Sequence, residues 1–243
     1  RRLRGYETRG PIIEVPIDSD DPEAGSHRHV TTNRHGGLAR TVLARAFPIS
    51  IDTEKYQELA RRPDIQARAQ EIREELGNPQ TIMLGVDRLD YTKGIGHRLK
   101  AFGELLRDGA LSAEDVTLVQ VASPSRERVE TYRQLRDEIE LTVGRINGDY
   151  STLGHSAIAY LHHGYPREEM VALYLAADVM LVTALRDGMN LVAKEYVASR
   201  VDDDGVLILS EFAGASDELR QALLINPHDI EGLKESILQA IAM

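Results

Sequence analysis

The sequence predicts an α/β protein built on a doubly wound, Rossmann-like parallel sheet. Short apolar segments rich in Val, Ile and Leu alternate with amphipathic segments along most of the chain, as in βα units joined by right-handed crossovers. The apolar segments show no polar alternation, which is expected of strands covered on both faces. Polar loops containing glycine follow two of these segments, at the edge where a parallel sheet binds ligands.

The individual elements follow from the same pattern. Strands are predicted for residues 81–86, 116–122, 158–161, 178–183, 205–209 and 223–226. Helices are predicted for residues 54–76, 94–106, 126–143, 167–176, 189–199 and 230–241, with a short helix at 216–220. Helical spacing of apolar residues supports these assignments, as for Ile95, Leu99 and Phe102. Gly77 and Pro79 end the first helix, because both residue types interrupt helical patterns.

The first 50 residues depart from this alternation. Residues 12–17 and 41–49 are apolar and strand-like. Residues 18–37 are rich in Asp, Gly, His and Ser, and they predict a loop or a flexible hairpin. We therefore divide the chain into a leader and linker, residues 1–50, and a Rossmann-like domain, residues 51–243.

The composition of the chain excludes several kinds of site and partner. The chain of 243 residues has 42% hydrophobic residues, no cysteine and a formal net charge of -10. The apolar content suffices for a core, and the lack of cysteine excludes disulfides, thiolate metal sites and cysteine nucleophiles. The acidic balance disfavours nucleic acid and anionic membranes as partners. No apolar run is long enough to cross a bilayer, so we expect a cytoplasmic enzyme.

The first polar loop follows the predicted strand 81–86. Residues 85–94 (GVDRLDYTKG) place Arg88 and Lys93 on a turn bracketed by glycines. Two cations at the carboxyl edge of a parallel sheet can neutralise a diphosphate without a metal ion. The alternative is a surface salt-bridge turn in which these cations pair with Asp87 and Asp90.

The second polar loop follows the predicted strand 178–183. Residues 183–195 (TALRDGMNLVAKE) place 187–190 at a helix N-terminus, where free amides and the helix dipole attract phosphate oxygens. Gly188 lets a ligand approach the backbone because it has no Cβ. Asp187 and Glu195 could accept hydrogen bonds from sugar and ribose hydroxyls. The alternative is an ordinary helix cap by Asp187 or Asn190, with Glu195 solvated.

Together the two loops resemble the donor-binding half of the trehalose-6-phosphate synthase family, retaining glycosyltransferases of the two-domain GT-B fold. The similarity continues through residues 46–52 (AFPISID), 123–129 (SPSRERV), 144–148 (GRING), 209–215 (LSEFAGA) and 226–229 (NPHD), and spans most of 41–243. Such an ordered series is more specific than any single motif. Ala184 stands where the family usually has proline, and residues 18–37 match poorly.

The resemblance implies a role for each matching residue. Arg88 and Lys93 match residues that hold the diphosphate of an activated glucose, and with Asp187 they form the implied catalytic set. The implied donor ligands are Arg88, Lys93, Tyr165, Asp187, Gly188, Met189, Asn190, Leu191 and Glu195, with Tyr165 at the base and Glu195 at the ribose. Arg126 matches an arginine that reaches the phosphate of the acceptor. For Arg126 the alternative is a solvated helix position beside Glu130.

The implied reaction transfers glucose from a nucleoside-diphosphate glucose to glucose 6-phosphate, giving trehalose 6-phosphate with retained configuration. The nucleotide sugar and glucose 6-phosphate are the expected partners, and no cofactor or metal is expected. Two alternatives stay open: a glucosylglycerol-phosphate synthase that uses glycerol 3-phosphate, and a non-catalytic regulatory subunit. The sequence leaves the donor base (UDP, GDP or ADP) open and is compatible with a homo-oligomer.

Two other groups of residues are of types that can bind a metal ion, but a loop or a turn is the simpler interpretation of each. His27, His29 and His35 fall in the polar loop 18–37, where no rigid element is predicted to hold an ion. The acidic run 202–204 precedes Gly205 and suits a turn.

In the family an acceptor-binding domain precedes this region and a last helix crosses back to it. We therefore expect residues 1–50 to end that domain, the chain to stop before the crossing helix, and this piece alone to be inactive.

Overall fold

The computed structural model describes residues 2–3, 6–9, 12–16, 30–32, 38–43, 49–126 and 128–243. The chain forms two compact units, Arg1–Ile49 and Ser50–Met243. The first unit holds an antiparallel five-stranded sheet of order β1-β2-β3-β5-β4. Its strands are β1 Arg2–Leu3, β2 Tyr6–Arg9, β3 Ile12–Pro16, β4 Val30–Thr32 and β5 Leu38–Leu43.

The first unit agrees in part with the expected leader. β3 matches the predicted strand 12–17. β5 begins before the predicted segment 41–49 and ends at Leu43, and residues 44–48 lie outside the described residues. The expected loop 18–37 contains β4, which pairs antiparallel with β5. The remainder of that loop, with His27, His29 and His35, also lies outside the described residues.

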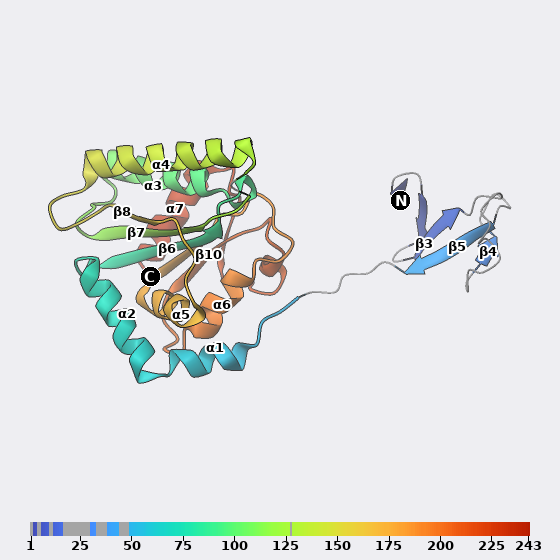
Figure 1. The fold of residues 1–243 in the computed structure, drawn as a ribbon, viewed down its shortest axis with the longest axis horizontal. Helices are drawn as coiled ribbons and strands as arrows, with labels where there is room; N and C mark the ends of the chain where they lie inside the picture. The colour runs from blue at the N-terminus through green and yellow to red at the C-terminus, as the bar shows by residue number, and fades with distance from the viewer. Residues whose placement is uncertain are drawn as a thin grey trace. The chain divides into compact units, whose positions relative to one another are not determined.

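The second unit holds a parallel six-stranded sheet of order β11-β10-β9-β6-β7-β8 (Figure 1). Its strands are β6 Thr81–Arg88, β7 Val116–Ser123, β8 Ile158–Leu161, β9 Val179–Val182, β10 Val206–Ser210 and β11 Leu223–Ile225. Along the chain, β6 to β8 extend the sheet in one direction and β9 to β11 in the other. The order therefore reverses between β6 and β9, where doubly wound sheets bind ligands. The predicted fold class is confirmed.

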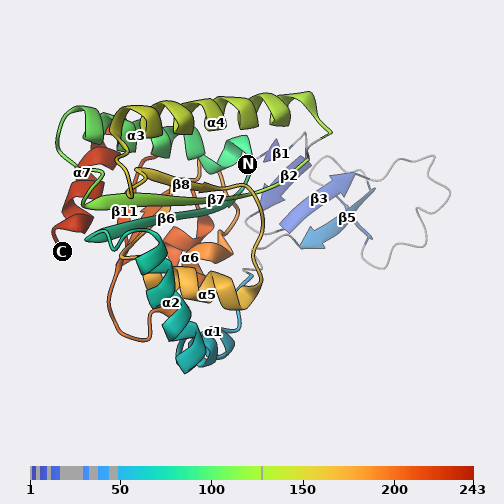
Figure 2. The same cartoon turned by 60° about the vertical axis from the view of Figure 1, so that its left-hand side comes forward.

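Helices cover both faces of this sheet, as Figures 1 and 2 show. One face packs against α1, α2, α5 and α6, and the other against α3, α4 and α7. The helices are α1 Thr53–Ala60, α2 Pro63–Glu75, α3 Ile95–Arg107, α4 Glu130–Tyr150, α5 Arg167–Ala176, α6 Leu191–Ser199 and α7 Ile230–Ile241. Short 3-10 turns are η1 Tyr91–Lys93 and η2 Gly214–Asp217. Within the described ranges no helix is long and apolar enough to span a membrane.

Two long predicted helices, 54–76 and 126–143, differ from the structure by more than two residues. The single helix 54–76 is two helices, because Pro63 opens α2 and holds Arg62 in an extended conformation. The helix predicted for 126–143 begins at Glu130 and continues to Tyr150. It continues past Gly144 because Ile146 still packs into the core beside Gly103 of α3, and tertiary packing outweighs the low helix propensity of glycine.

A buried arginine joins the carboxyl ends of the central strands. Arg98 of α3 is fully buried. Its Nη1 donates to Asp87 Oδ2 of β6 at 2.9 Å and to Gln120 Oε1 of β7 at 2.6 Å. Its Nη2 donates to Thr183 Oγ1, just after β9, at 3.0 Å. Gly85 makes room for the guanidinium, because a Cβ there would lie 1.9 Å from Arg98 Nη1.

We expect Arg98→Met to lower the free energy of unfolding by about 3–5 kcal/mol, because it leaves the buried Asp87 carboxylate without its cation. Urea denaturation followed by circular dichroism would measure the change. Arg62→Ala is the control, since Arg62 pairs with Asp64 on the surface, and it should leave the transition unchanged. A loss below about 1 kcal/mol for Arg98→Met would show that the buried pair is not needed for stability.

Candidate functional site

The two polar loops lie side by side at the carboxyl edge of the sheet. They follow β6 and β9, which are neighbours in the sheet. The backbone amide of Leu185 donates to Thr92 O at 2.7 Å, and the Thr183 hydroxyl donates to Gly94 O at 3.2 Å. Both loops therefore lie at the carboxyl edge of the sheet, where the sequence predicted them, and they contact each other.

Gly94 makes this close approach possible. Its φ of 66° lies in the left-handed region, which costs glycine little and other residues more. A Cβ on Gly94 would lie 2.1 Å from Thr183 O. Both the turn and the contact with the second loop therefore require glycine at this position.

Lys93 and Asp187 form an ion pair between the loops. Lys93 Nζ lies 2.6 Å from Asp187 Oδ2, and the two side chains are only 15% and 17% exposed. Asp187 also accepts from Asn190 Nδ2 at 3.2 Å and from the Met189 amide at 3.4 Å. Burial acts to raise the pKa of Asp187, but the Lys93 ammonium and these hydrogen bonds outweigh it and lower the pKa. Asp187 is therefore an ionised acceptor at neutral pH.

Arg88 is the exposed cation of the first loop. It ends β6 beside Ser123 of β7, and strand alternation directs it away from the buried Asp87. No described side chain forms an ion pair with Arg88, and Asp87 pairs with Arg98 instead. The alternative of a salt-bridge turn among Asp87, Arg88, Asp90 and Lys93 is therefore wrong for the described residues.

The second loop leads directly into α6. Asn190 is the N-cap, with φ 71°, and its Oδ1 accepts from the Ala193 amide at 3.0 Å. The amides of Leu191 and Val192, in the first turn of α6, have no intrahelical acceptor. A Cβ on Gly188 would meet no atom of the described chain. The N-terminus of α6 thus begins about two residues later than predicted and presents donors beside Lys93.

Residues 212–215 support the second loop, a contact that was not predicted from the sequence. The backbone of residues 212–215 accepts from the Asp187 amide at 3.1 Å and donates to Asp187 O at 3.2 Å and to Met189 O at 2.7 Å. A Cβ on Gly214 would lie 2.3 Å from Gly188 O. The LSEFAGA segment marks these residues in the sequence, but its contact with the loop depends on the pairing of β9 with β10.

Glu195 is half-buried rather than fully solvated. Its Oε2 accepts from the Tyr174 hydroxyl of α5 at 2.9 Å. Tyr56 of α1 lies near enough for the charge of Glu195 to raise the pKa of the Tyr56 hydroxyl. Glu195 lies four residues after Leu191, on the same face of α6.

Arg126 lies in the loop before α4, with φ 47°, and not in a helix as predicted. Its Nη1 donates to the Tyr132 hydroxyl at 2.9 Å, which donates to Asp90 Oδ2 at 3.1 Å. Asp90 Oδ1 accepts from the Thr92 amide at 2.9 Å. Arg126 also borders a cavity of about 390 Å³ together with Ser125 and Arg128. Hydrogen bonds therefore connect Arg126 to the first loop, whereas Glu130 pairs with Arg133.

Tyr165 follows β8 at the same edge of the sheet. A Cβ on the preceding Gly164 would lie 3.6 Å from Ser123 Oγ, at the end of β7. The Tyr165 ring lies 4.4 Å from that of His163, and its hydroxyl is 3.1 Å from His163 Nε2. Tyr165 borders a small cavity of about 140 Å³ against α2 and α5. Its contacts are therefore on that side of the sheet, and not with Lys93 or Asp187.

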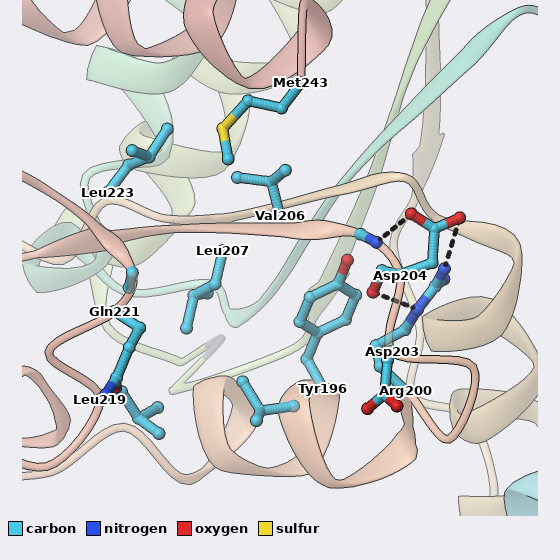
Figure 3. Close-up of a pocket in the computed structure, with 13 residues that line it drawn as sticks. Tyr196, Arg200, Asp203, Asp204, Val206, Leu207, Leu219, Gln221, Leu223 and Met243 are labelled. Carbon is cyan, nitrogen blue, oxygen red and sulfur yellow. Dashed lines mark hydrogen bonds and ion pairs between the residues drawn. The ribbon is translucent and has the colours of Figure 1, made fainter.

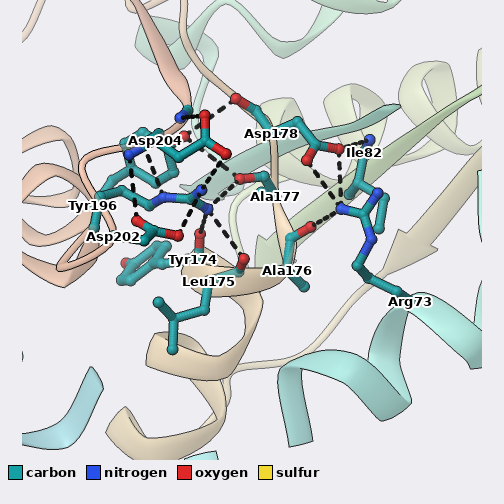
Figure 4. Close-up of polar contacts among 12 residues, drawn as sticks. Arg73, Ile82, Tyr174, Leu175, Ala176, Ala177, Asp178, Tyr196, Asp202 and Asp204 are labelled. Atoms are coloured by element: carbon teal, nitrogen blue, oxygen red, sulfur yellow. Dashed lines mark hydrogen bonds and ion pairs between the residues drawn. The ribbon is translucent and has the colours of Figure 1, made fainter. Parts of the chain in front are cut away.

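The acidic run 202–204 lies at the opposite, amino-terminal edge. Arg200 pairs with Asp202 at 3.0 Å and with Asp204 at 3.9 Å. It also donates to carbonyls at the end of α5, near Asp178, which binds Arg73 (Figure 4). Among the residues that the structure describes, no group of three or more His, Asp or Glu could hold a metal ion.

A cavity of about 310 Å³ lies at this opposite edge (Figure 3). Its apolar walls include Val206 and Leu223, the first residues of β10 and β11, and Tyr196 and Asp204 also border it. Because β10 and β11 begin there, this cavity is separated from the Lys93–Asp187 pair by the length of the sheet. We therefore place the candidate site at the carboxyl edge.

Comparisons with known proteins agree with the resemblance of the loops. A trehalose-6-phosphate synthase of Mycobacterium avium (strain 104) is 60% identical over 203 residues, covering 84% of this chain and 41% of the relative. That of Mycobacterium leprae (strain TN) is 59% identical over 241 residues, covering 99% and 46%. The chain thus spans less than half the length of these relatives.

Solved structures are similar as well. The UDP-forming alpha,alpha-trehalose-phosphate synthase from Burkholderia xenovorans, in complex with glucose-6-phosphate, gives a TM-score of 0.79 at 40% identity, covering 84% of this chain and 45% of that one. An E. coli structure bound with UDP-2-fluoro glucose gives 0.78 at 35%, covering 90% and 49%. The family model of glycosyltransferase family 20 matches residues 26–243. The predicted resemblance is confirmed, and the chain belongs to glycosyltransferase family 20.

Proposed function

We propose that this chain is the donor-binding part of a retaining glucosyltransferase that makes trehalose 6-phosphate from a nucleoside-diphosphate glucose and glucose 6-phosphate. The observation that carries the proposal is that Arg88, Lys93 and the N-terminus of α6 share the carboxyl edge of the sheet, where the strand order reverses. Solved relatives with glucose-6-phosphate or UDP-2-fluoro glucose support this choice of substrates.

The donor diphosphate would lie between the two loops. Arg88 and Lys93 supply positive charge, and the amides of Met189, Asn190 and Leu191 supply hydrogen bonds to phosphate oxygens. Gly188 leaves space beside the backbone for the sugar. Asp187, ionised and held by Lys93, would accept from hydroxyls of the glucose, Glu195 from the ribose, and Tyr165 would lie near the base.

In the proposed reaction, the acceptor attacks C1 of the donor glucose from the same face from which the leaving group departs. The anomeric hydroxyl of the acceptor forms a bond to C1 of the donor glucose as the bond from C1 to the phosphate oxygen breaks. The hydroxyl proton passes to that phosphate oxygen. Arg88 and Lys93 would stabilise the negative charge that develops on the diphosphate, and Arg126 would orient the acceptor through its phosphate.

This role assigns the two parts of the chain different tasks. Residues 51–243 would bind the donor, and residues 1–50 would belong to the end of an acceptor-binding domain. Residues 1–243 by themselves would then bind a nucleotide sugar without turnover. A cytoplasmic location, a reaction without a metal cofactor, the absence of nucleic-acid and membrane partners, and a homo-oligomeric state stay predictions from the sequence.

In the full-length protein, Arg88→Ala or Lys93→Ala should lower kcat by about 10²–10³-fold, because each removes a cation from the leaving diphosphate. A coupled assay of nucleoside diphosphate release, with UDP-, GDP- and ADP-glucose as donors, would measure it. Lys100→Ala removes an exposed lysine of α3 and should leave kcat unchanged. An unchanged kcat in both site variants would refute the assigned role.

Acceptor choice would separate the remaining alternatives in the same full-length protein. Product analysis should show trehalose 6-phosphate with glucose 6-phosphate as acceptor, and no product with glycerol 3-phosphate. Turnover with glycerol 3-phosphate alone would establish a glucosylglycerol-phosphate synthase. Sugar-phosphate binding without turnover by any donor would establish a regulatory subunit.

Replacing Lys93 with Met should raise the pKa of Asp187, because burial then acts without the ammonium that opposes it. Since the pKa of Asp187 is lowered in the folded protein, its contribution to stability is present at neutral pH and is lost as the pH falls through that pKa. The variant should therefore lose less stability on acidification. Carbon-13 NMR titration of the carboxyl group would measure the pKa. Lys100→Met should not change it, and an unchanged value in Lys93→Met would contradict the ion pair.

A further inference from the structure

The carboxylate of Glu195 lies between two buried tyrosines from different helices. Tyr174 of α5 is 1% exposed and its hydroxyl donates to Glu195 Oε2 at 2.9 Å. Tyr56 of α1 is 8% exposed, and the nearby charge of Glu195 raises the pKa of its hydroxyl. An exposed helical glutamate would have many rotamers, whereas a fixed donor favours one. The carboxylate orientation is thus set from outside α6.

Both tyrosines are fixed by further contacts. The Arg167 guanidinium lies over the Tyr56 ring, 5.6 Å from its centroid. The Tyr174 ring packs edge-to-face on that of Tyr196, with centroids 6.3 Å apart. These arrangements are favourable for a cation over a ring and for paired aromatic rings. The positions of both tyrosine side chains beside Glu195 are therefore held by packed rings.

The two hydroxyls stay protonated across the physiological range. Burial, and then the charge of Glu195, raises the pKa of Tyr56 to about 12. The same causes raise the pKa of Tyr174 well above its ordinary value. A phenol that stays protonated can donate its hydrogen to the carboxylate. A carboxylate has two oxygens and about four lone-pair positions, so acceptor positions remain beside the phenol.

We propose that Tyr174 and Tyr56 are positioning residues that aim the Glu195 carboxylate at the ribose hydroxyls of the nucleotide. The inference rests on the proposed function, in which Glu195 accepts from the ribose. After the Tyr174 hydroxyl is bound, the carboxylate keeps acceptor positions for the vicinal hydroxyls of a ribose.

Calorimetric titration of the chain with UDP and with 2′,3′-dideoxy-UDP would test the proposal. Tyr174→Phe keeps the ring and removes the hydroxyl, so it should weaken UDP binding about five- to tenfold and leave dideoxy-UDP binding unchanged. Tyr56→Phe should act in the same direction. In the Tyr174→Phe/Glu195→Gln double variant, UDP should bind no more weakly than in Glu195→Gln alone, because the tyrosine acts only through the carboxylate.

Tyr160→Phe is the matched control, since the Tyr160 hydroxyl is buried on β8 and has no partner among the described residues. It should change neither affinity. If Tyr174→Phe weakens the binding of UDP and of dideoxy-UDP equally, the positioning role is overturned and a structural one is left. The same holds if the losses of UDP affinity in the double variant are additive. If Glu195→Gln itself weakens both ligands equally, the ribose assignment fails and the proposal with it. Absence of any UDP, GDP or ADP binding by the unaltered chain would instead overturn the proposed function.

Discussion

The buried ion pair between Arg98 and Asp87 is the interaction on which the rest of the second unit depends. The Arg98 guanidinium reaches from α3 to β6, to Gln120 of β7 and to Thr183 after β9. A fully buried charge must keep its partners, because an unpaired one is strongly destabilising. The carboxyl ends of three adjacent strands are therefore held together, and the loops that follow two of them start from fixed positions.

The reversal of strand order then gives these loops a shared space. β6 and β9 are neighbours, although β7 and β8 come between them in the chain. Gly94 allows the first loop to touch the end of β9 without a steric clash. The result is an uneven distribution of charge, with Lys93 paired to Asp187 and Arg88 exposed at the end of β6. A polyanion bound between the loops would pair directly with Arg88. Lys93 would first have to give up its ion pair with Asp187.

The sequence by itself determined the fold class, most elements and the family. Residues 167–176 and 230–241 form α5 and α7 with the predicted bounds, because apolar spacing is a local property of the chain. The loop motifs identified the family because they keep charged residues and glycines at fixed intervals. The break at Pro63 was missed, although proline disfavours a helical conformation for the preceding residue. Asn190 as N-cap was one of the two alternatives that the sequence offered.

Only the tertiary structure decided which side chains meet. Arg98 falls in the predicted helix 94–106 without any local mark of burial, yet it is buried against Thr183, 85 positions away in the sequence. Glu195 was predicted to accept from a ribose, and its partner Tyr174, on another helix, was not predicted. Periodicity reports which face of an element is buried, but not which element lies opposite. The partners of a buried polar group are set by strand order and helix packing, and these join parts of the chain that no local pattern relates.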